Sequence, residues 1–226
     1  MRTERLLLIV LLAVLLAPRA EAAPPWTEGR DYVVITPPQP TNVAPGKIEV
    51  LEVFSYGCPA CNAFQPTMAR LEKSLPANAQ VAYLPASFIP SEDWPMFQRA
   101  YFAAQALGIA ARTQQDMYDA VWKSGELATS DPQTHRLKSP LPTIEDAARS
   151  YARWTGVKPE EFLAMARSFA VDMKMRAADA QIQAMQVLGT PSIVVNGHYR
   201  VNNDSVRSAD QLIALVRYLI DKDSAH

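Results

Sequence analysis

The stretch that decides the fold is IEVLEVFSYGCPACNAFQPTM, residues 48–68. It opens with a nearly continuous run of apolar and β-branched residues, 48–54, as is typical of a strand buried on both faces. Ser55, Tyr56 and Gly57 interrupt this run. Pro59 then suits the first position of a helix, because the N–H at that position has no partner within a helix. We therefore expect a strand, a short turn and a helix that continues to about residue 75, with a kink at Pro66.

The two cysteines of the chain, Cys58 and Cys61, both lie at the start of this expected helix. Cys58 should lie at or near the N-cap, beneath unpaired backbone N–H groups and the positive end of the helix dipole. Such surroundings stabilise a thiolate and lower the thiol pKa. Each pKa unit of lowering corresponds to about 1.4 kcal/mol in favour of the anion. Cys61 lies one turn deeper on the same helical face, where it can attack a mixed disulfide formed at Cys58.

Three other interpretations of this cysteine pair compete with a redox role. A structural disulfide that closes a four-residue loop restrains little of the unfolded chain. A zinc site lacks a second C-x-x-C, and His135, His198 and His226 lack ligand spacing. Two inert thiols do not fit the strand–proline–helix context. The sequence favours a redox pair, with Pro59 and Ala60 completing the motif, and we expect no metal.

The first 22 residues have the features of a secretory signal peptide. Arg2 and Arg5 form a basic start, residues 6–17 are apolar, and small residues precede an expected cleavage after Ala22. The alternative is an uncleaved N-terminal anchor. Export implies an oxidising compartment, which suits an enzyme that acts on the disulfides of other proteins. The formal net charge of −1 and the lack of a basic face argue against nucleic-acid binding.

The remaining chain predicts two β-containing halves that share one sheet, with a helical block between them. Strands are expected at residues 32–35, 48–54, 81–85, 192–195 and 198–201, the last two joined by an Asn196-Gly197 hairpin turn. Further helices are expected at 93–107, at 113–122, at 144–154 with Thr143 as N-cap, from Pro159, at 169–188 with Gly189 as terminator, and at 209–219 with Ser208 as N-cap. The expected division is signal peptide 1–22, first part of the sheet domain 23–91, inserted helical subdomain 92–168, second part 169–221, and disordered tail 222–226. Trp94, Trp122 and Trp154 are interpreted as packing residues.

From about residue 29 to 219, this chain resembles the DsbA family, the periplasmic thiol–disulfide oxidoreductases with a thioredoxin fold. The resemblance rests on the helical insertion and on three motifs: Glu52-Val53-Phe54-Ser55, Cys58-Pro59-Ala60-Cys61, and Gly189-Thr190-Pro191 before Asn196-Gly197. It implies an α/β fold: a thioredoxin-like sheet flanked by helices, with an inserted all-helical subdomain.

The resemblance also implies roles for three residues outside the C-x-x-C motif. Pro191 would be cis and lie against the cysteines, leaving the Thr190 backbone free to pair with an extended substrate; the alternative is an ordinary trans proline. Glu52 would be a buried acid that exchanges a proton with Cys61; the alternative is a carboxylate that reaches solvent at the end of the sheet. Ala60 replaces the histidine of strongly oxidising members, so the enzyme is expected to be a milder oxidant.

The function that follows from the resemblance is donation of the Cys58–Cys61 disulfide to unfolded exported proteins with free thiols, through a mixed disulfide at Cys58. No cofactor is needed, a membrane partner of the DsbB type would reoxidise the pair, and the protein is expected to be a monomer in the periplasm. The alternatives are a reductase or isomerase on the same scaffold, and a non-enzymatic peptide-binding chaperone or metal carrier.

Overall fold

A five-stranded sheet joins segments from both ends of the chain. The computed structural model describes residues 26–131, 133–134 and 136–225, so the expected signal peptide lies outside the described residues. The strand order is β1-β5-β4-β2-β3, in which β2 and β3 are parallel and the other pairs are antiparallel. The strands are β1 (Tyr32–Val34), β2 (Ile48–Phe54), β3 (Ala79–Pro85), β4 (Ser192–Val195) and β5 (Tyr199–Val201). The five expected strands are therefore present, and both halves of the chain contribute to one sheet.

The predicted buried strand, β2, lies between β3 and β4. All seven of its residues are buried, as expected for an apolar run covered on both faces. Its register places Glu52 opposite Tyr83 of β3 and opposite Ile193 of β4. Because β2 is enclosed by strands and by helices on both faces, the turn that follows it starts from a fixed position.

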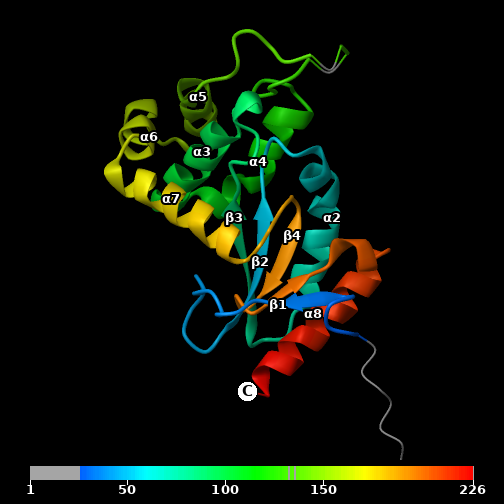
Figure 1. Ribbon diagram of the computed structural model, residues 1–226. Helices are drawn as coiled ribbons and strands as arrows, with labels where there is room; N and C mark the ends of the chain where they lie inside the picture. The colour runs from blue at the N-terminus through cyan, green and yellow to red at the C-terminus, as the bar shows by residue number, and fades with distance from the viewer. Residues whose placement is uncertain (1–25, 132, 135, 226) are drawn as a thin grey trace, which may run out of the picture.

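Two helices cover one face of the sheet, α2 (Pro59–Ser74) and α8 (Ala209–Ser224) (Figure 1). Met68 and Leu71 of α2 and Leu215 of α8 share one apolar cluster with Val50 and Ile193 of the sheet. As predicted, α2 continues through Pro66 and ends near residue 75.

The expectation of a disordered tail at residues 222–226 is wrong for residues 222–224, because α8 extends to Ser224. Asp223 holds this last turn against the hairpin between β4 and β5. Its carboxylate accepts a hydrogen bond from the Asn196 side-chain amide at 2.6 Å and lies 3.2 Å from His198 Nδ1. These partners are distant in sequence, so local patterning could not reveal them.

The helices between β3 and β4 form the expected all-helical insertion and pack over the end of the sheet near the start of α2 (Figure 1). They are α3 (Trp94–Ala106), α4 (Ala110–Trp122), α5 (Ile144–Thr155) and α6 (Pro159–Ala166), followed by α7 (Phe169–Ala184). One apolar cluster joins Leu51 and Val53 of β2 to Phe97 of α3 and Tyr118 of α4. None of the helices in the described part of the chain is both long enough and apolar enough to cross a bilayer.

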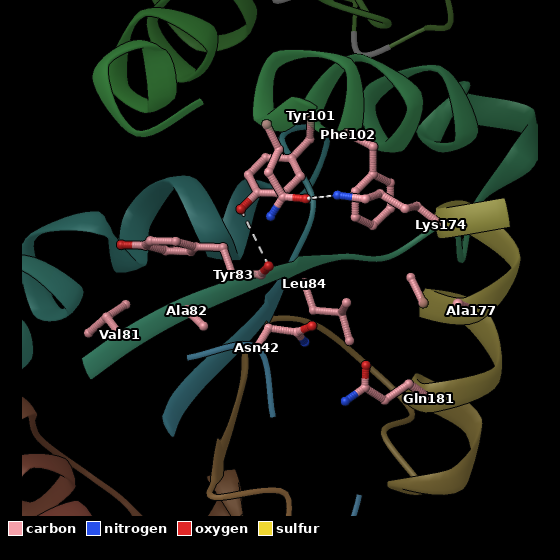
Figure 2. A pocket seen from close by; sticks show the side chains of 12 residues that line it. Asn42, Val81, Ala82, Tyr83, Leu84, Tyr101, Phe102, Lys174, Ala177 and Gln181 are labelled. Atoms are coloured by element: carbon pink, nitrogen blue, oxygen red, sulfur yellow. Dashed lines mark hydrogen bonds between the residues drawn. The ribbon is translucent and has the colours of Figure 1, made fainter. Parts of the chain in front are cut away.

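Helix α7 lies beside β3, and Figure 2 shows the hollow between them. This hollow has a volume of about 290 Å³ and contains neither cysteine. Lys174 of α7 donates to the Gln105 side-chain oxygen of α3 at 2.8 Å, so α7 and α3 are linked across this hollow.

The expected end of α7 is wrong: the helix stops at Ala184, and Gly189 is not its terminator. The chain leaves the helix at Gln186, whose φ of 53° lies in the left-handed region. The next N–H, that of Val187, donates back to the Ile182 carbonyl at 3.1 Å, and the Val187 side chain is buried. Burial of Val187 therefore favours the left-handed conformation of Gln186, which glycine normally adopts at the end of a helix.

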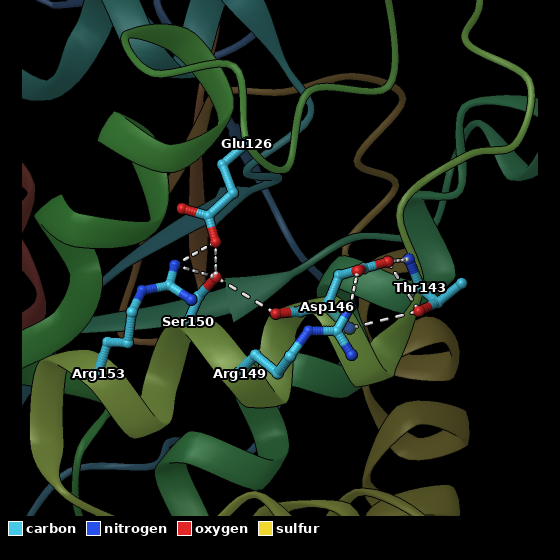
Figure 3. A network of polar contacts seen from close by, with 6 residues as sticks. All are labelled: Glu126, Thr143, Asp146, Arg149, Ser150 and Arg153. Carbon is cyan, nitrogen blue, oxygen red and sulfur yellow. Dashed lines mark hydrogen bonds and ion pairs between the residues drawn. The ribbon is translucent and has the colours of Figure 1, made fainter.

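A polar network fixes the long loop between α4 and α5 (Figure 3). Glu126 of the loop accepts hydrogen bonds from Ser150 and from Arg153, both on α5. Asp146 completes a capping box with Thr143 at the start of α5, as the sequence led us to expect for a Thr143 N-cap. The neighbouring Leu127 is completely buried, so the first part of this loop is packed against the helices.

The hairpin turn generates a stability prediction. Gly197 has a φ of +63°, and a Cβ there would lie 2.1 Å from the Gln39 carbonyl oxygen. Gly46 also has a positive φ, +81°, but a Cβ there meets nothing within 4 Å. We expect Gly197→Ala to lower the free energy of unfolding by at least about 3 kcal/mol, and Gly46→Ala by only about 1 kcal/mol. Urea unfolding measures both values, and equal losses would contradict the close approach at Gly197.

Candidate redox site

Cys58 is the N-cap of α2, as the sequence predicts. Its backbone is extended, with φ of −85° and ψ of 116°, and Pro59 occupies the first turn. The Cys58 sulfur accepts a hydrogen bond from the Cys61 backbone N–H at 3.3 Å. The sulfur thus occupies the position where a helix offers unpaired donors and the positive end of its dipole.

The turn between β2 and Cys58 is held from within the sheet domain and from the helical block. The Ser55 hydroxyl accepts from the Gly57 N–H at 3.2 Å, and the Cys58 N–H donates to the Ser55 carbonyl at 3.1 Å. From the helical block, the Trp122 indole donates to the Tyr56 carbonyl at 2.8 Å. The position of Cys58 therefore depends on the insertion as well as on α2.

The two thiols, which are not joined in this structure, have opposite pKa shifts. The hydrogen bond from the Cys61 side chain lowers the pKa of Cys58 to about 6, with help from backbone donors and against the effect of burial. The same hydrogen bond raises the pKa of Cys61 well above its ordinary value, and burial and the nearby charges of Cys58 and Glu52 add to this. At neutral pH the outer sulfur is mainly a thiolate and the inner one a thiol.

Glu52 lies within the sheet and is fully buried, so the alternative in which its carboxylate reaches solvent is excluded. Neither carboxylate oxygen has a hydrogen-bond partner among the described residues. Burial, followed by the charge of Cys58, raises the pKa of Glu52 to about 8. The carboxyl group is therefore mainly protonated at neutral pH.

The loop before β4 brings Thr190 and Pro191 beside the cysteines. The Thr190–Pro191 peptide bond is cis, which confirms the geometry that the resemblance implied. The Cys58 thiol lies 3.4 Å from the Thr190 carbonyl oxygen and can donate to it. The role of this loop in substrate binding stays a prediction.

A cleft of about 800 Å³ opens at Cys58, between the sheet domain and the helical block. It is lined by Gly57, Cys58, Pro59, Phe88, Ile89, Glu92, Trp94, Trp122, Thr129, Ser130, Leu137, Leu188, Gly189 and Thr190. Ala60 and Pro191 line a neighbouring hollow together with Phe64. The predicted residues therefore gather at one place: Cys61 and Glu52 are buried, and the others border the two hollows.

The cleft residues that sequence reasoning missed include Phe88, Glu92, Trp122, Leu137 and Leu188. The interpretation of Trp122 as a packing residue is incomplete, because Trp122 is 37% exposed and lines the cleft. These residues come from four separate segments, and no local pattern distinguishes them from other residues of the surface. Among the described His, Cys, Asp and Glu side chains, no group of three could hold a metal ion.

A C-x-x-C pair at a helix N-terminus, with one activated and one buried thiol beside a cis-proline loop, defines a thiol–disulfide oxidoreductase. Comparison with known proteins agrees. The sequence model of the DSBA-like thioredoxin domain matches residues 49–214. The chain therefore belongs to the DSBA-like thioredoxin family, and its sheet and helices have the thioredoxin-like fold.

Curated relatives and solved structures extend this similarity over most of the chain. The thiol:disulfide interchange protein DsbA of Pseudomonas aeruginosa is 34% identical over 206 residues, which are 91% of this chain and 90% of the relative. The DsbA of Burkholderia cepacia is 29% identical and covers 96% of each chain. The crystal structure of oxidoreductase DsbA from Xylella fastidiosa superposes with a TM-score of 0.73 at 30% identity, covering 87% of this chain and 96% of that chain. The protein is an enzyme of thiol–disulfide exchange.

The buried carboxyl group of Glu52 generates a prediction for stability against pH. Between the pKa of an ordinary glutamate, about 4.3, and the folded-state pKa of about 8, the folded protein holds a proton that the unfolded chain has lost. Stability is therefore lost as pH rises through this window. In the reduced protein, in which both cysteines are free, Glu52→Gln removes this loss. It should increase the free energy of unfolding at pH 7 by about 2–4 kcal/mol, and much less at pH 4.

Urea unfolding of the reduced wild type and the reduced Glu52→Gln variant, at pH 4 and at pH 7, measures this difference. A gain that is the same at both pH values would show that Glu52 does not titrate with a raised pKa.

Proposed function

We propose that this enzyme donates the Cys58–Cys61 disulfide to unfolded proteins that carry free thiols. The observation that carries the proposal is the hydrogen bond from the Cys61 N–H to the Cys58 sulfur at 3.3 Å, at the helix N-terminus and within an open cleft. A thiolate stabilised in the reduced enzyme favours the loss of the disulfide to a substrate.

The proposed reaction has two exchange steps. A substrate thiolate attacks the Cys58 sulfur of the oxidised enzyme, a substrate–Cys58 disulfide forms, and the Cys58–Cys61 bond breaks with Cys61 as leaving group. A second substrate thiolate then attacks the substrate sulfur of this mixed disulfide. A substrate disulfide forms and Cys58 leaves as a thiolate. Two electrons pass from the substrate to the enzyme, and no further group takes part.

Glu52 is the proposed proton donor to Cys61 in the first step. The leaving Cys61 thiolate has a raised pKa, and the Glu52 charge is among the causes that raise it, so the two groups interact. A carboxyl group with a pKa of about 8 carries a proton at neutral pH and can give it up. Transfer of this proton would leave Cys61 as the neutral buried thiol.

The size of the fall in the Cys58 pKa supports the role of the enzyme as an oxidant. If the thiol pKa falls from about 8.5 in the unfolded chain to about 6 in the folded one, the reduced form gains roughly 1.4 kcal/mol at pH 7. For a two-electron couple this corresponds to about 30 mV of reduction potential. The backbone N–H of Ala60 helps to lower this pKa, but its side chain supplies neither a hydrogen bond nor a charge to the thiolate, so a milder oxidant is the expected result. A reductase or isomerase on the same scaffold is the second candidate.

The proposed setting is the periplasm, reached through a cleaved signal peptide at residues 1–22. The proposed substrates are exported proteins that have not yet folded, and a membrane partner of the DsbB type would reoxidise the pair. The proposed division places the inserted helical subdomain at residues 92–168, which hold α3 to α6. A monomer is sufficient for this reaction, since both sulfurs belong to one chain.

Trapping of the mixed disulfide tests the assignment of the two sulfurs. We expect the reduced Cys61→Ser variant to accumulate a mixed disulfide with an unfolded peptide that contains a disulfide, because Cys58 attacks and no second thiol resolves the adduct. The matched Cys58→Ser variant should give no adduct, because Cys61 is completely buried, and this burial both blocks its attack and raises its pKa. Mass spectrometry detects the adduct, and equal trapping by both variants would contradict the proposed roles.

Redox titration of the wild type against glutathione tests the direction of transfer. The oxidant role predicts a potential less negative than the value of about −270 mV for thioredoxin. A value at or below that of thioredoxin would favour the reductase alternative.

A further inference from the structure

The loop that brings Thr190 to the Cys58 sulfur is exposed in its first half. Leu188 is 94% exposed, and Gly189 after it is exposed as well. A Cβ at Gly189 would meet no atom within 4 Å, so there is open space beside the backbone here. We call residues 188–191 the Thr190 loop. Because packing holds this loop so little, its position depends on hydrogen bonds.

Two side chains hold the backbone on either side of Thr190. The Ser192 hydroxyl, at the start of β4, donates to the Gly189 carbonyl at 2.8 Å. The Asn203 side-chain amide donates to the Pro191 carbonyl at 2.7 Å. The two carbonyls that flank Thr190 in the loop are therefore both occupied by donors of the protein itself.

The carbonyl of Thr190 faces the reactive sulfur instead. It lies 3.4 Å from the Cys58 sulfur, which can donate to it as a thiol. A thiolate has no S–H to donate, and the sulfur of a disulfide has none either. In both of these states of Cys58, the Thr190 carbonyl is open to a backbone N–H of a substrate.

Asn203 supplies a bond that the sheet ladder no longer provides. Strands β4 and β5 are antiparallel, with Val194 opposite Arg200. Continuing this register by three residues on each strand places Asn203 opposite Pro191. At that point β5 has ended and the chain has turned into the short helix η2 (Asn203–Ser205). The Asn203 side chain therefore gives the N–H that the backbone of a paired strand would give.

The turn that carries Asn203 is anchored to the N-terminal edge of the sheet. The Asn202 side-chain amide donates to the Arg30 carbonyl, and its backbone N–H donates to the Asp31 carbonyl, both at 2.9 Å. Asp31 is buried, and its carboxylate accepts from the Thr27 N–H at 2.7 Å. The donor of Asn203 thus approaches the Thr190 loop from a fixed position.

We propose that Asn203 is a positioning residue of the exchange reaction, which holds the Thr190 backbone, through the Pro191 carbonyl, in the orientation that an extended substrate needs. Asn203 itself does not touch the reacting sulfurs. This inference rests on the proposed function, because the substrate backbone must pair with Thr190 while its thiol reacts at Cys58. If the loop moves, the substrate thiol loses its alignment with the disulfide, and loss of alignment lowers the rate.

The Cys58 thiol provides an independent readout of the loop position. The Cys61 side chain lowers the pKa of Cys58 most, burial opposes this effect, and a hydrogen bond of Thr190 lowers the pKa further. Movement of the loop away from the sulfur removes the last contribution. In the reduced protein, Asn203→Ala should therefore raise the midpoint of the Cys58 titration above that of the wild type.

Model thiols test the effect of Asn203 on the reaction. The measured quantity is the rate constant for reduction of the oxidised enzyme by an unfolded peptide with one cysteine, divided by the rate constant for mercaptoethanol. Asn203→Ala should lower this ratio roughly 3–10-fold, because the peptide has a backbone that the loop aligns and mercaptoethanol has none. A residue that only supports the fold would change both rate constants together and leave the ratio unchanged.

The matched control is Gln181→Ala. Gln181 of α7 also uses an exposed side-chain amide to donate to a proline carbonyl, that of Pro40, at 2.8 Å. It lines the hollow between α7 and β3, which contains neither cysteine. Gln181→Ala should keep both the rate ratio and the Cys58 midpoint of the wild type.

A modified substrate tests the same proposal on the unaltered enzyme. In this peptide the backbone nitrogen of the residue before the cysteine carries a methyl group, so it cannot donate to the Thr190 carbonyl. The wild type should react with it roughly 3–10-fold more slowly than with the unmodified peptide or with one methylated far from the cysteine. In Asn203→Ala this difference should largely disappear, because the two changes act on the same contact.

The outcomes separate this inference from the proposed function. Failure of the wild type to exchange disulfides with any thiol would overturn the function itself. Normal exchange with an unchanged rate ratio in Asn203→Ala, or an equal fall of the ratio in Gln181→Ala, would overturn the role of Asn203 alone. Equal rates of the wild type with the methylated and unmodified peptides would also overturn it, because the Thr190 carbonyl would then take no part in binding the substrate.

Discussion

The whole site depends on two hydrogen bonds to the sulfur of Cys58: one from the Cys61 side chain, which lowers the Cys58 pKa most, and one from the Cys61 backbone N–H. The backbone bond exists because Pro59 starts α2 directly after Cys58, which places the sulfur over the unpaired donors of the first turn. The buried strand β2 fixes where that turn lies. A sulfur in this position is stabilised as an anion, and the neighbouring Cys61, deeper in the protein, is stabilised as a thiol.

The helical insertion is part of this site and does more than cover the sheet. Trp122 at the end of α4 donates to the Tyr56 carbonyl, and the Tyr56 hydroxyl donates to Gln114 of the same helix at 2.7 Å. The insertion thus holds the turn that carries Cys58 and also supplies six of the fourteen residues that line the cleft beside it. The thioredoxin-like sheet provides the reactive pair, and the insertion forms one side of the cleft beside it.

The sequence was sufficient for whatever depends on neighbours along the chain. The strand, the turn and the N-cap at residues 48–61 follow from local patterning, and Thr143 and Ser208 cap their helices as expected. The sequence could not show the features that depend on contacts between residues far apart in the chain. Burial of Val187 ends α7 early, Asp223 orders the last turn of α8, and Leu137 and Leu188 meet at the cleft only through the fold. The sequence left open whether the Glu52 carboxylate is buried or reaches solvent. In the structure Glu52 lies on β2 between β3 and β4, and it is fully buried.

The stabilised thiolate is the central claim, and direct titration of Cys58 tests it most simply. The far-ultraviolet absorbance of the thiolate is followed against pH in the reduced protein, with the Cys58→Ser variant as the baseline. The account predicts a midpoint close to pH 6. A midpoint near 8.5, the value of a free cysteine, would contradict it.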